Sequence, residues 1–320
     1  MVLELSPICR WCGLGPLEPR LSFSLPDEAP GVGRGPFELQ ACAECGTWQV
    51  NPHPGLAVIR RFFEDPRRWA PALDPNSRPV DPLRRAEERL GEYRRYAAAL
   101  KAQLPERGLI LDVGAGTGLM LSLLDGVPNP RLAVEPNPAA AAEAARRGLQ
   151  VSGQWAEELR PPFGALAALI MNQSLDHLVR PDLFLGRALH WLAPGGLVLL
   201  SGLINPRSLA ARVYGPSHRL FHPFHQVYPP PTAVRRLLAP WGLELTAVWK
   251  PYFGTPYGSW RQLLSASAAM TVRLLRPGAA GPSPAFPGSC AAYLARKTLL
   301  TRSLTFPDPN PTCSRRPVET

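Results

Sequence analysis

The chain has 320 residues, of which 45% are hydrophobic and 19% charged, so it is no disordered polyelectrolyte and can bury a large core. Its formal net charge of +10 comes almost wholly from arginine, which suits either an anionic partner or a solvated basic surface. No apolar run approaches the ~18–20 residues that cross a bilayer. The N-terminus also lacks the charged and apolar regions of a signal peptide. We therefore expect a cytoplasmic protein without a membrane span.

Residues 1–55 form a head in which cysteines occur as two CxxC pairs, at Cys9 and Cys12 and at Cys42 and Cys45. Four thiolates complete a tetrahedral zinc site with no open position, which would be structural and would supply folding energy. The two pairs are separated by more than the usual 15–20 residues, so we expect an additional loop around "PGVGRGP". Four unrelated buried thiols, or a redox dithiol, are the alternatives.

Residues 56–82 are rich in proline and predict an irregular connector. Asp81 and Pro82 then suit an N-cap and a first helical position. Apolar residues recur at three- and four-residue spacing as far as Leu104, and Pro105 follows. This pattern predicts one amphipathic helix at the start of the next domain.

From residue 109 onward, short apolar runs alternate with helix-like segments. Strands are predicted at 109–113, 131–135, 149–153, 165–172, 196–203, 244–250 and 290–297, and helices at 118–126, 138–148 and 180–196. Strands that alternate with helices indicate βαβ units and a largely parallel sheet covered on both faces. We predict one α/β domain over 83–300 and a disordered tail over 301–320.

A glycine-rich loop follows the first of these strands, in the sequence "LDVGAGTG". Gly114, Gly116 and Gly118 allow tight turning and close approach of a ligand, at the strand end where such sheets bind ligands. Glu135 ends the next strand and can accept hydrogen bonds from both hydroxyls of a ribose. No Gly-Lys pair exists, which excludes a P-loop. Asp112 would sit poorly beside a pyrophosphate and suits a cofactor with an ammonium group, such as S-adenosylmethionine (SAM); a glycine turn without a ligand is the remaining alternative.

The segments "LDVGAGTG", "AVEPN", "MNQSLDHLVRPDLFL" and "WLAPGGLVLL" resemble, in order and spacing, the motifs of class I SAM-dependent methyltransferases. The resemblance covers about residues 83–300 and implies a Rossmann-like, seven-stranded sheet with SAM as cofactor. It also implies the residues that hold the cofactor: the three loop glycines at the methionine part, Asp112 at the amino group through water, Glu135 at the ribose, Gln154 or Trp155 near the adenine, and Asn172 over the methionine side.

The head resembles the zinc-ribbon heads of a bacterial group of SAM methyltransferases, through "LQACAECGTWQVNPHPG". Some members of that group methylate carbons or oxygens of nucleotide-linked sugars and secondary metabolites. In related enzymes the region after the fifth strand, here about 204–240, caps the substrate. It is rich in histidine and aromatic residues in this chain.

Three histidines are candidates for a general base toward the methyl acceptor, because histidine is the most common such group. His177 follows the fourth strand, and His222 and His225 lie in the cap region. We expect a methyltransferase that acts on the oxygen or carbon of a small molecule, such as a sugar nucleotide, glycan or secondary metabolite. An RNA methyltransferase, or a zinc-ribbon binding protein on an inactive scaffold, are the alternatives. Against the RNA alternative, no "NPPY"-like signature follows the fourth strand.

Overall fold

The computed structural model describes residues 3–69, 72–73, 79–81, 87–162, 164–278 and 281–298. The predicted tail over 301–320 and the predicted helix start at 82–86 lie outside the described residues. Within the described part of the chain, no helix combines the length and the apolar character needed to cross a membrane.

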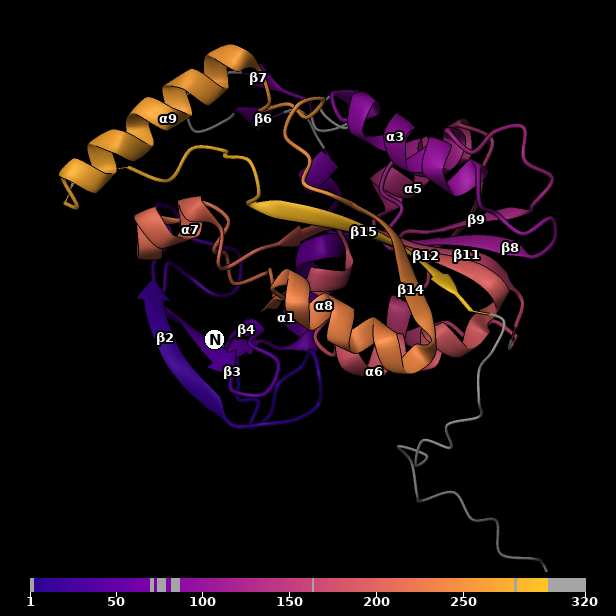
Figure 1. Cartoon of the computed structure of the whole chain (residues 1–320), viewed down its shortest axis with the longest axis horizontal. Helices are drawn as coiled ribbons and strands as arrows, with labels where there is room; N and C mark the ends of the chain where they lie inside the picture. Colours follow the sequence, from indigo (N-terminus) through magenta and orange to yellow (C-terminus); the bar gives the residue numbers. More distant parts are fainter. Residues whose placement is uncertain are drawn as a thin grey trace, which may run out of the picture.

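A seven-stranded sheet forms the centre of the molecule, with the strand order β10-β9-β8-β11-β12-β15-β14 (Figure 1). The first five strands are parallel, and β15 is antiparallel to both of its neighbours. The strands are β8 (Leu109–Val113), β9 (Arg131–Val134), β10 (Gln150–Ser152), β11 (Leu166–Asn172), β12 (Leu192–Ile204), β14 (Leu243–Trp249) and β15 (Cys290–Lys297). This arrangement confirms the predicted α/β class and the Rossmann-like sheet of class I methyltransferases.

Helices cover both faces of the sheet because its central strands are apolar on both sides, as in β11, where six of seven residues are buried. One face packs against α3 (Leu90–Lys101), α4 (Leu119–Ser122) and α5 (Pro138–Arg146). The other packs against α6 (Pro181–Ala188) and α8 (Pro231–Leu238). Asn137 caps α5 by accepting hydrogen bonds from two backbone amides, as an N-cap residue does. Helix α4 is shorter than the predicted segment 118–126.

The head contains a second, four-stranded antiparallel sheet with the order β13-β4-β3-β2. Its strands are β2 (Leu17–Phe23), β3 (Phe37–Cys42), β4 (Trp48–Val50) and β13 (Val227–Tyr228), and β1 (Leu3–Glu4) pairs with β5 (His53–Pro54) beside them. The β2–β3 hairpin accounts for the long gap between the two CxxC pairs, and "PGVGRGP" lies in its loop. Strand β13 comes from the predicted cap, so head and cap share one sheet.

The connector is more ordered than its prolines suggest. The prediction of irregular backbone is wrong for its first part, where α1 (Leu56–Glu64) and a 3-10 helix (Pro66–Trp69) form, followed by β6 (Ala72–Leu73) and β7 (Pro79–Val80). Helix α1 is stabilised by tertiary contacts, because the ring of Phe62 stacks on Phe224 at 3.6 Å and Ile59 is buried. Three further helices were not predicted, α7 (Leu209–Tyr214), α8 and α9 (Trp260–Leu275).

Candidate active site and metal centre

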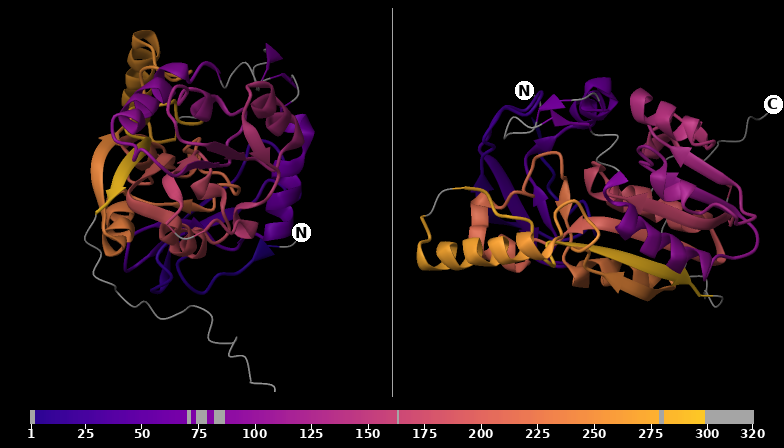
Figure 2. Two further views of the ribbon diagram at one scale, coloured as in Figure 1. Left: turned by 90° about the vertical axis from the view of Figure 1, so that its right-hand side faces the viewer. Right: turned by 90° about the horizontal axis from the view of Figure 1, so that it is seen from above.

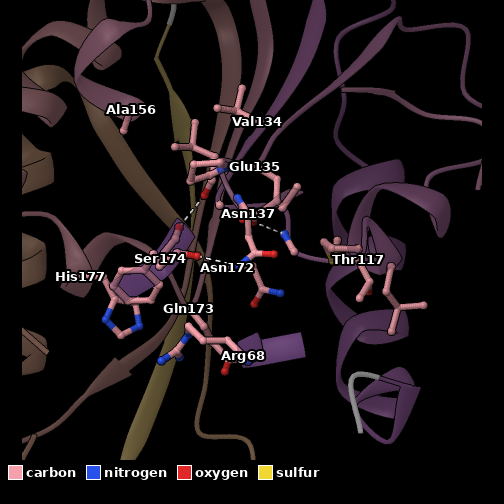
Figure 3. A pocket seen from close by; sticks show the side chains of 18 of the residues that line it. Arg68, Thr117, Val134, Glu135, Asn137, Ala156, Asn172, Gln173, Ser174 and His177 are labelled. Carbon is pink, nitrogen blue, oxygen red and sulfur yellow. Dashed lines mark hydrogen bonds between the residues drawn. The ribbon is translucent and has the colours of Figure 1, made fainter. Parts of the chain in front are cut away.

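A cavity of about 500 Å³ lies beside the carboxyl ends of β8, β9 and β11 (Figure 3). This is the edge at which open α/β sheets bind their ligands. The loop after β8, the loop after β9 and the segment 154–157 line one side, which we call the cofactor half. Residues from α1, from 68–69, from the start of α3, from the segment after β11 and from 256–257 line the other side, which we call the acceptor half.

The glycine loop is shaped for close approach. Gly114 has a φ of +76°, and a Cβ atom there would lie 2.5 Å from the Cβ of Ser174. The hydroxyl of Ser174 donates a hydrogen bond to the Val113 carbonyl at 2.6 Å, which ties the end of β11 to the end of β8. Gly116 also lines the cavity with a positive φ. Only glycine fits the first position without moving the neighbouring strand end.

Glu135 lines the cavity at the end of β9, as predicted for a residue that binds a ribose. One carboxylate oxygen accepts a hydrogen bond from the amide of Gly116 and the other from the amide of Asn137, each at 2.8 Å. Burial raises the pKa of this carboxyl above its ordinary value. Each oxygen keeps a further lone pair for a ligand hydroxyl. Glu135 therefore holds the glycine loop in place, and its oxygens keep acceptor capacity at the cavity.

Asp112 is fully buried at the end of β8, and it does not line the cavity. Neither of its carboxylate oxygens has a hydrogen-bond partner among the described residues. Burial, with a smaller contribution from Glu135, raises the pKa of Asp112 to about 8. A buried carboxyl without partners is costly unless a cation or donor approaches it. This fits a cofactor with an ammonium group, reached through the loop or a water molecule.

The remaining residues that the sequence predicts for the cofactor fall into two groups. Gln154, Trp155 and Asn172 line the cavity. The indole nitrogen of Trp155 donates to Glu64 of α1 at 2.8 Å. Gly118 does not reach the cavity; a Cβ there would meet Leu149 at 2.5 Å, so this glycine allows α4 to pack closely on its neighbours.

The acceptor half is aromatic and cationic. Its residues include Phe63, Arg68, Trp69, Arg89, Tyr93, His177 and Tyr257. The guanidinium of Arg68 lies 3.8 Å from the ring centre of Phe62, a cation–π contact. In the view of Figure 3, Asn172 lies between Glu135 and Arg68. A flat or apolar acceptor with an anionic group fits such a lining.

His177 is the candidate base that reaches the cavity. Its Nδ1 donates to the Phe224 carbonyl at 2.8 Å, since a carbonyl only accepts, and Nε2 is therefore left with the lone pair. Burial lowers the pKa of His177 to about 4, so the ring is neutral at physiological pH.

A buried carboxylate–histidine pair supports the His177 ring. The ring stacks on that of His225 at 4.7 Å, and His225 Nδ1 lies 2.7 Å from Asp176 Oδ2. Asp176 is almost fully buried; burial alone would raise its pKa, but His177 and His225 bring it below the ordinary value. Together these three side chains place a neutral imidazole nitrogen beside an oriented Asp–His pair.

His222 and His225 do not line the cavity. His222 is held by Tyr228, whose hydroxyl accepts from the His222 amide and donates to its carbonyl, both at 2.9 Å. Burial lowers the pKa of His222 to about 3. The structure therefore gives His222 a place in the packing of the cap, and it puts His225 behind His177.

Sequence reasoning missed Gln173, which lines the cavity with a φ of +56°. This left-handed conformation is uncommon for a residue other than glycine and tends to occur at functional sites. The amide of Gln173 donates to the Ser201 carbonyl, and its side chain donates to the Tyr93 hydroxyl at 3.1 Å. Its position directly after a buried strand was the available signal. Phe63, Arg68 and Tyr257 gave no local signal.

The four head cysteines converge on one point. Their sulfur atoms lie within 4.8 Å of one another, with Cys9–Cys45 at 3.8 Å and Cys12–Cys42 at 3.7 Å, and none forms a disulfide. Tetrahedral coordination with Zn–S bonds of about 2.3 Å separates the sulfurs by about 3.8 Å. The geometry thus fits the predicted structural zinc, held by all four thiolates.

Comparisons with known proteins agree with this picture. A family model described as a methyltransferase domain matches residues 83–248, whereas comparison with curated proteins gave no match. Similar solved structures include a SAM-dependent methyltransferase of Thermotoga maritima, with 18% identity, 75% of this chain and 98% of that chain covered, and a TM-score of 0.47.

Two further solved structures have a similar degree of likeness to this chain. A geranyl diphosphate C-methyltransferase of Streptomyces coelicolor has 15% identity, with 63% of this chain and 77% of that chain covered and a TM-score of 0.44. A SAM-dependent methyltransferase of Mesorhizobium loti has 16% identity, with 62% and 96% covered and a TM-score of 0.42. At these identities and TM-scores, the similarities do not bear on the acceptor or on partners.

Proposed function

The chain belongs to the family of methyltransferase domains, and from this premise we propose that it methylates a small molecule bound in the acceptor half of the cavity, with SAM in the cofactor half. The observation that carries the proposal is one cavity with two chemically different halves. Glu135 and the glycine loop face one half, and His177 faces the other. When bound, SAM would supply the methyl group from its sulfonium, and the sulfur would become a neutral thioether.

We propose that His177 is the general base. An acceptor hydroxyl that points at its Nε2 would pass its proton there as the new bond to the methyl carbon forms. The ring is neutral before the reaction because burial holds its pKa at about 4. His225 and Asp176 are positioning residues, since they contact His177 and each other without lining the cavity. The negative charge of Asp176 favours the imidazolium that forms on His177.

A small acceptor is favoured over RNA by the shape and lining of the acceptor half. Helix α1 contributes the aromatic side chain of Phe63 to its wall, and the ring of Trp69 lies between the two halves, close to Gly116. An aromatic cavity with a few polar groups is typical of small-molecule sites. The guanidinium of Arg68 favours an acceptor that carries a carboxylate or phosphate, whereas Arg89 is already paired with Glu92 at 3.1 Å.

The test is methyl transfer from labelled SAM to a panel of phenols, hydroxy acids and nucleotide sugars, with total RNA as a separate arm. We expect label in a small product, and His177→Ala should lower kcat by about 10²–10⁴-fold, the usual contribution of a general base. His225→Ala should lower kcat less and shift the pH profile, and SAM affinity should stay unchanged in both variants. Label only in RNA would overturn the small-molecule proposal. Unchanged turnover in His177→Ala would remove this residue from catalysis.

We also propose that the head binds one structural zinc ion through Cys9, Cys12, Cys42 and Cys45. The spacing of the sulfurs supports this. Metal analysis of the purified protein should find one equivalent of zinc. Absence of bound metal in folded protein would contradict the proposal.

A further inference from the structure

Helix α9 projects from one edge of the molecule, as Figures 1 and 2 show. It has 16 residues, and a capping box formed by Ser259 and Gln262 fixes its start. Its inner face packs on α7, where Met270 joins Ala210 and Tyr214 in a small buried cluster. The helix is therefore anchored to the body of the protein along one side only.

The outer face of α9 is apolar and exposed to solvent. Trp260 is 71% exposed, Leu264 70% and Leu275 78%. Ala268 and Thr271 complete a stripe at spacings of four, four, three and four residues, which lies on one side of a helix. Five of the eleven exposed large hydrophobic side chains among the described residues belong to this helix. Such a concentration marks an interaction surface, because isolated exposed apolar residues are normal but patches are not.

The charge around this stripe is of one sign. No aspartate or glutamate occurs between Glu244 and Asp308, whereas the same stretch contains seven arginines and lysines. Arg261 and Arg276 are exposed at the two ends of α9, and neither forms an ion pair with a described residue. An apolar stripe with tryptophan at its edge and arginines beside it is typical of a helix that lies in the interface of an anionic membrane.

A second copy of the chain fits this face poorly. A helix of this length offers a face of about 24 Å by 10 Å, well below the ~800 Å² per partner of a stable interface. In an antiparallel pair, Arg261 of one copy would also approach Arg276 of the other, with no acidic residue on either helix to compensate.

We propose that α9 docks this protein onto an anionic lipid bilayer, with Trp260, Leu264 and Leu275 inserted at the headgroup boundary and Arg261 and Arg276 at the phosphates. The loop before the helix contributes Pro256 and Tyr257 to the acceptor half of the cavity. Docking therefore holds one wall of that cavity beside the membrane surface. Resting on the proposed function, this indicates an amphiphilic acceptor that reaches the cavity from the lipid phase.

The test is flotation of the full-length protein with phosphatidylcholine vesicles that contain 30% phosphatidylglycerol. We expect binding that falls about thirtyfold in vesicles of phosphatidylcholine alone or in 0.5 M salt, because the two arginines contribute ~1 kcal/mol each near an anionic surface. The double variant Trp260→Ser/Leu264→Ser should lose at least about tenfold in binding through lost apolar insertion. Arg261→Glu/Arg276→Glu should lose a similar amount on anionic vesicles only.

The matched control is Leu5→Ser/Leu183→Ser, which removes two exposed leucines from the head and from α6. It should float like the unchanged protein. Calorimetric SAM binding that is equal in all variants shows that they are folded. No flotation of the unchanged protein, or equal flotation of Trp260→Ser/Leu264→Ser, overturns the proposal. So does a dimer in sedimentation that this double variant dissociates without any vesicle binding. Because flotation requires no methyl transfer, its outcome is independent of the proposed reaction.

Discussion

The two halves of the cavity are built in different ways. The cofactor half comes from residues that directly follow three successive parallel strands, β8, β9 and β10. The acceptor half comes from five segments spread between Ile59 and Tyr257. The cofactor half follows from local sequence, because a strand, a glycine loop and an acidic residue at the end of the next strand occur in that order along the chain. The acceptor half exists only when the connector, the start of α3, the segment after β11 and residues 256–257 are brought together, and no described residue of the head or of the predicted cap over 204–240 lines it.

One buried arginine shows how the head supports the acceptor half. Arg10 lies between the first two cysteines and is fully buried. Its guanidinium donates to the Gln226 side chain at 2.7 Å, to the Gln226 carbonyl at 2.9 Å and to the Val50 carbonyl at 2.6 Å. The Gln226 amide in turn donates to the carbonyl of Asp176. The cysteine cluster is thus connected to the Asp176–His225 pair through a few hydrogen bonds.

The largest expected effect is that of removing one head cysteine, which should impair methyl transfer much more than SAM binding. Cys9→Ser should abolish zinc binding and lower the free energy of unfolding by several kcal/mol, because a structural zinc contributes on the order of 10 kcal/mol to such folds. We expect methyl transfer to fall at least about a hundredfold as the Arg10 contacts loosen, and SAM affinity to stay within about threefold. Calorimetry with SAM and thermal denaturation measure both effects.

The matched control is Cys290→Ser, the same change at a cysteine of β15 outside the cluster. It should retain zinc. An equal loss of SAM affinity and methyl transfer in Cys9→Ser would show that the two halves are not separable.

The second prediction concerns the cofactor half alone. Glu135→Ala removes the acceptor of two backbone hydrogen bonds and of the ribose contact, so SAM affinity should fall by about 10- to 100-fold, at 1.5–3 kcal/mol for a hydrogen bond to a charged group. Glu244→Ala, at an exposed position of β14, is the control. Titration calorimetry measures the affinity, and zinc content should be unchanged. Equal SAM affinity in Glu135→Ala would contradict the assignment of Glu135 to the ribose.

The smallest effect is a pH dependence of SAM binding. The pKa of Asp112 is raised to about 8 in the free protein, so the carboxyl is protonated below that pH and must lose its proton to hold an ammonium group. SAM affinity should therefore rise with pH from 6.5 to 8, by at most about tenfold per unit, and then level off. Calorimetry in buffers of different ionisation enthalpy should detect up to about one released proton near pH 7.

The raised pKa of Asp112 should make the free energy of unfolding decrease with pH, whereas it makes SAM affinity increase. Without SAM, the folded state holds a proton on Asp112 that the unfolded chain has lost, so stability should fall as pH rises toward 8. Buried histidines have the opposite effect at lower pH. The pKa of His177 is about 4 in the folded protein and about 6.5 in the unfolded chain, so the unfolded chain takes up a proton first and stability falls as pH falls below about 6.5. Zinc-bound thiolates that gain protons on unfolding add a slope of the opposite sign, so only the difference between the unchanged protein and Asp112→Asn isolates Asp112. That difference in unfolding free energy should fall from pH 7 to 8, and the SAM affinity of Asp112→Asn should not depend on pH in this range. A difference that does not change with pH would assign the proton to another group.

Sequence patterns predicted the seven strands and their class because each strand is a short apolar run bounded by turn residues, as in 109–113 and 165–172. They did not predict α9, since its exposed leucines give no single buried face, or α1, whose order depends on Phe224 in the cap. Helix starts and ends differed by several residues, as for α4. Local hydrophobic periodicity predicts the presence of a strand better than it predicts where a short helix begins and ends.

The sequence by itself determined the cofactor half, because glycine spacing, Glu135 and strand ends act over a few residues and the carboxyl ends of parallel strands meet at one edge. It also indicated the cluster of four cysteines, through their paired spacing. Only the tertiary structure decided that His177 reaches the cavity whereas His222 and His225 stand behind it, and that Arg68 and Tyr257 complete the wall. These side chains come from segments up to about 190 residues apart in the chain, and their meeting depends on the packing of the connector and of the loop before α9 against the sheet rather than on any local pattern.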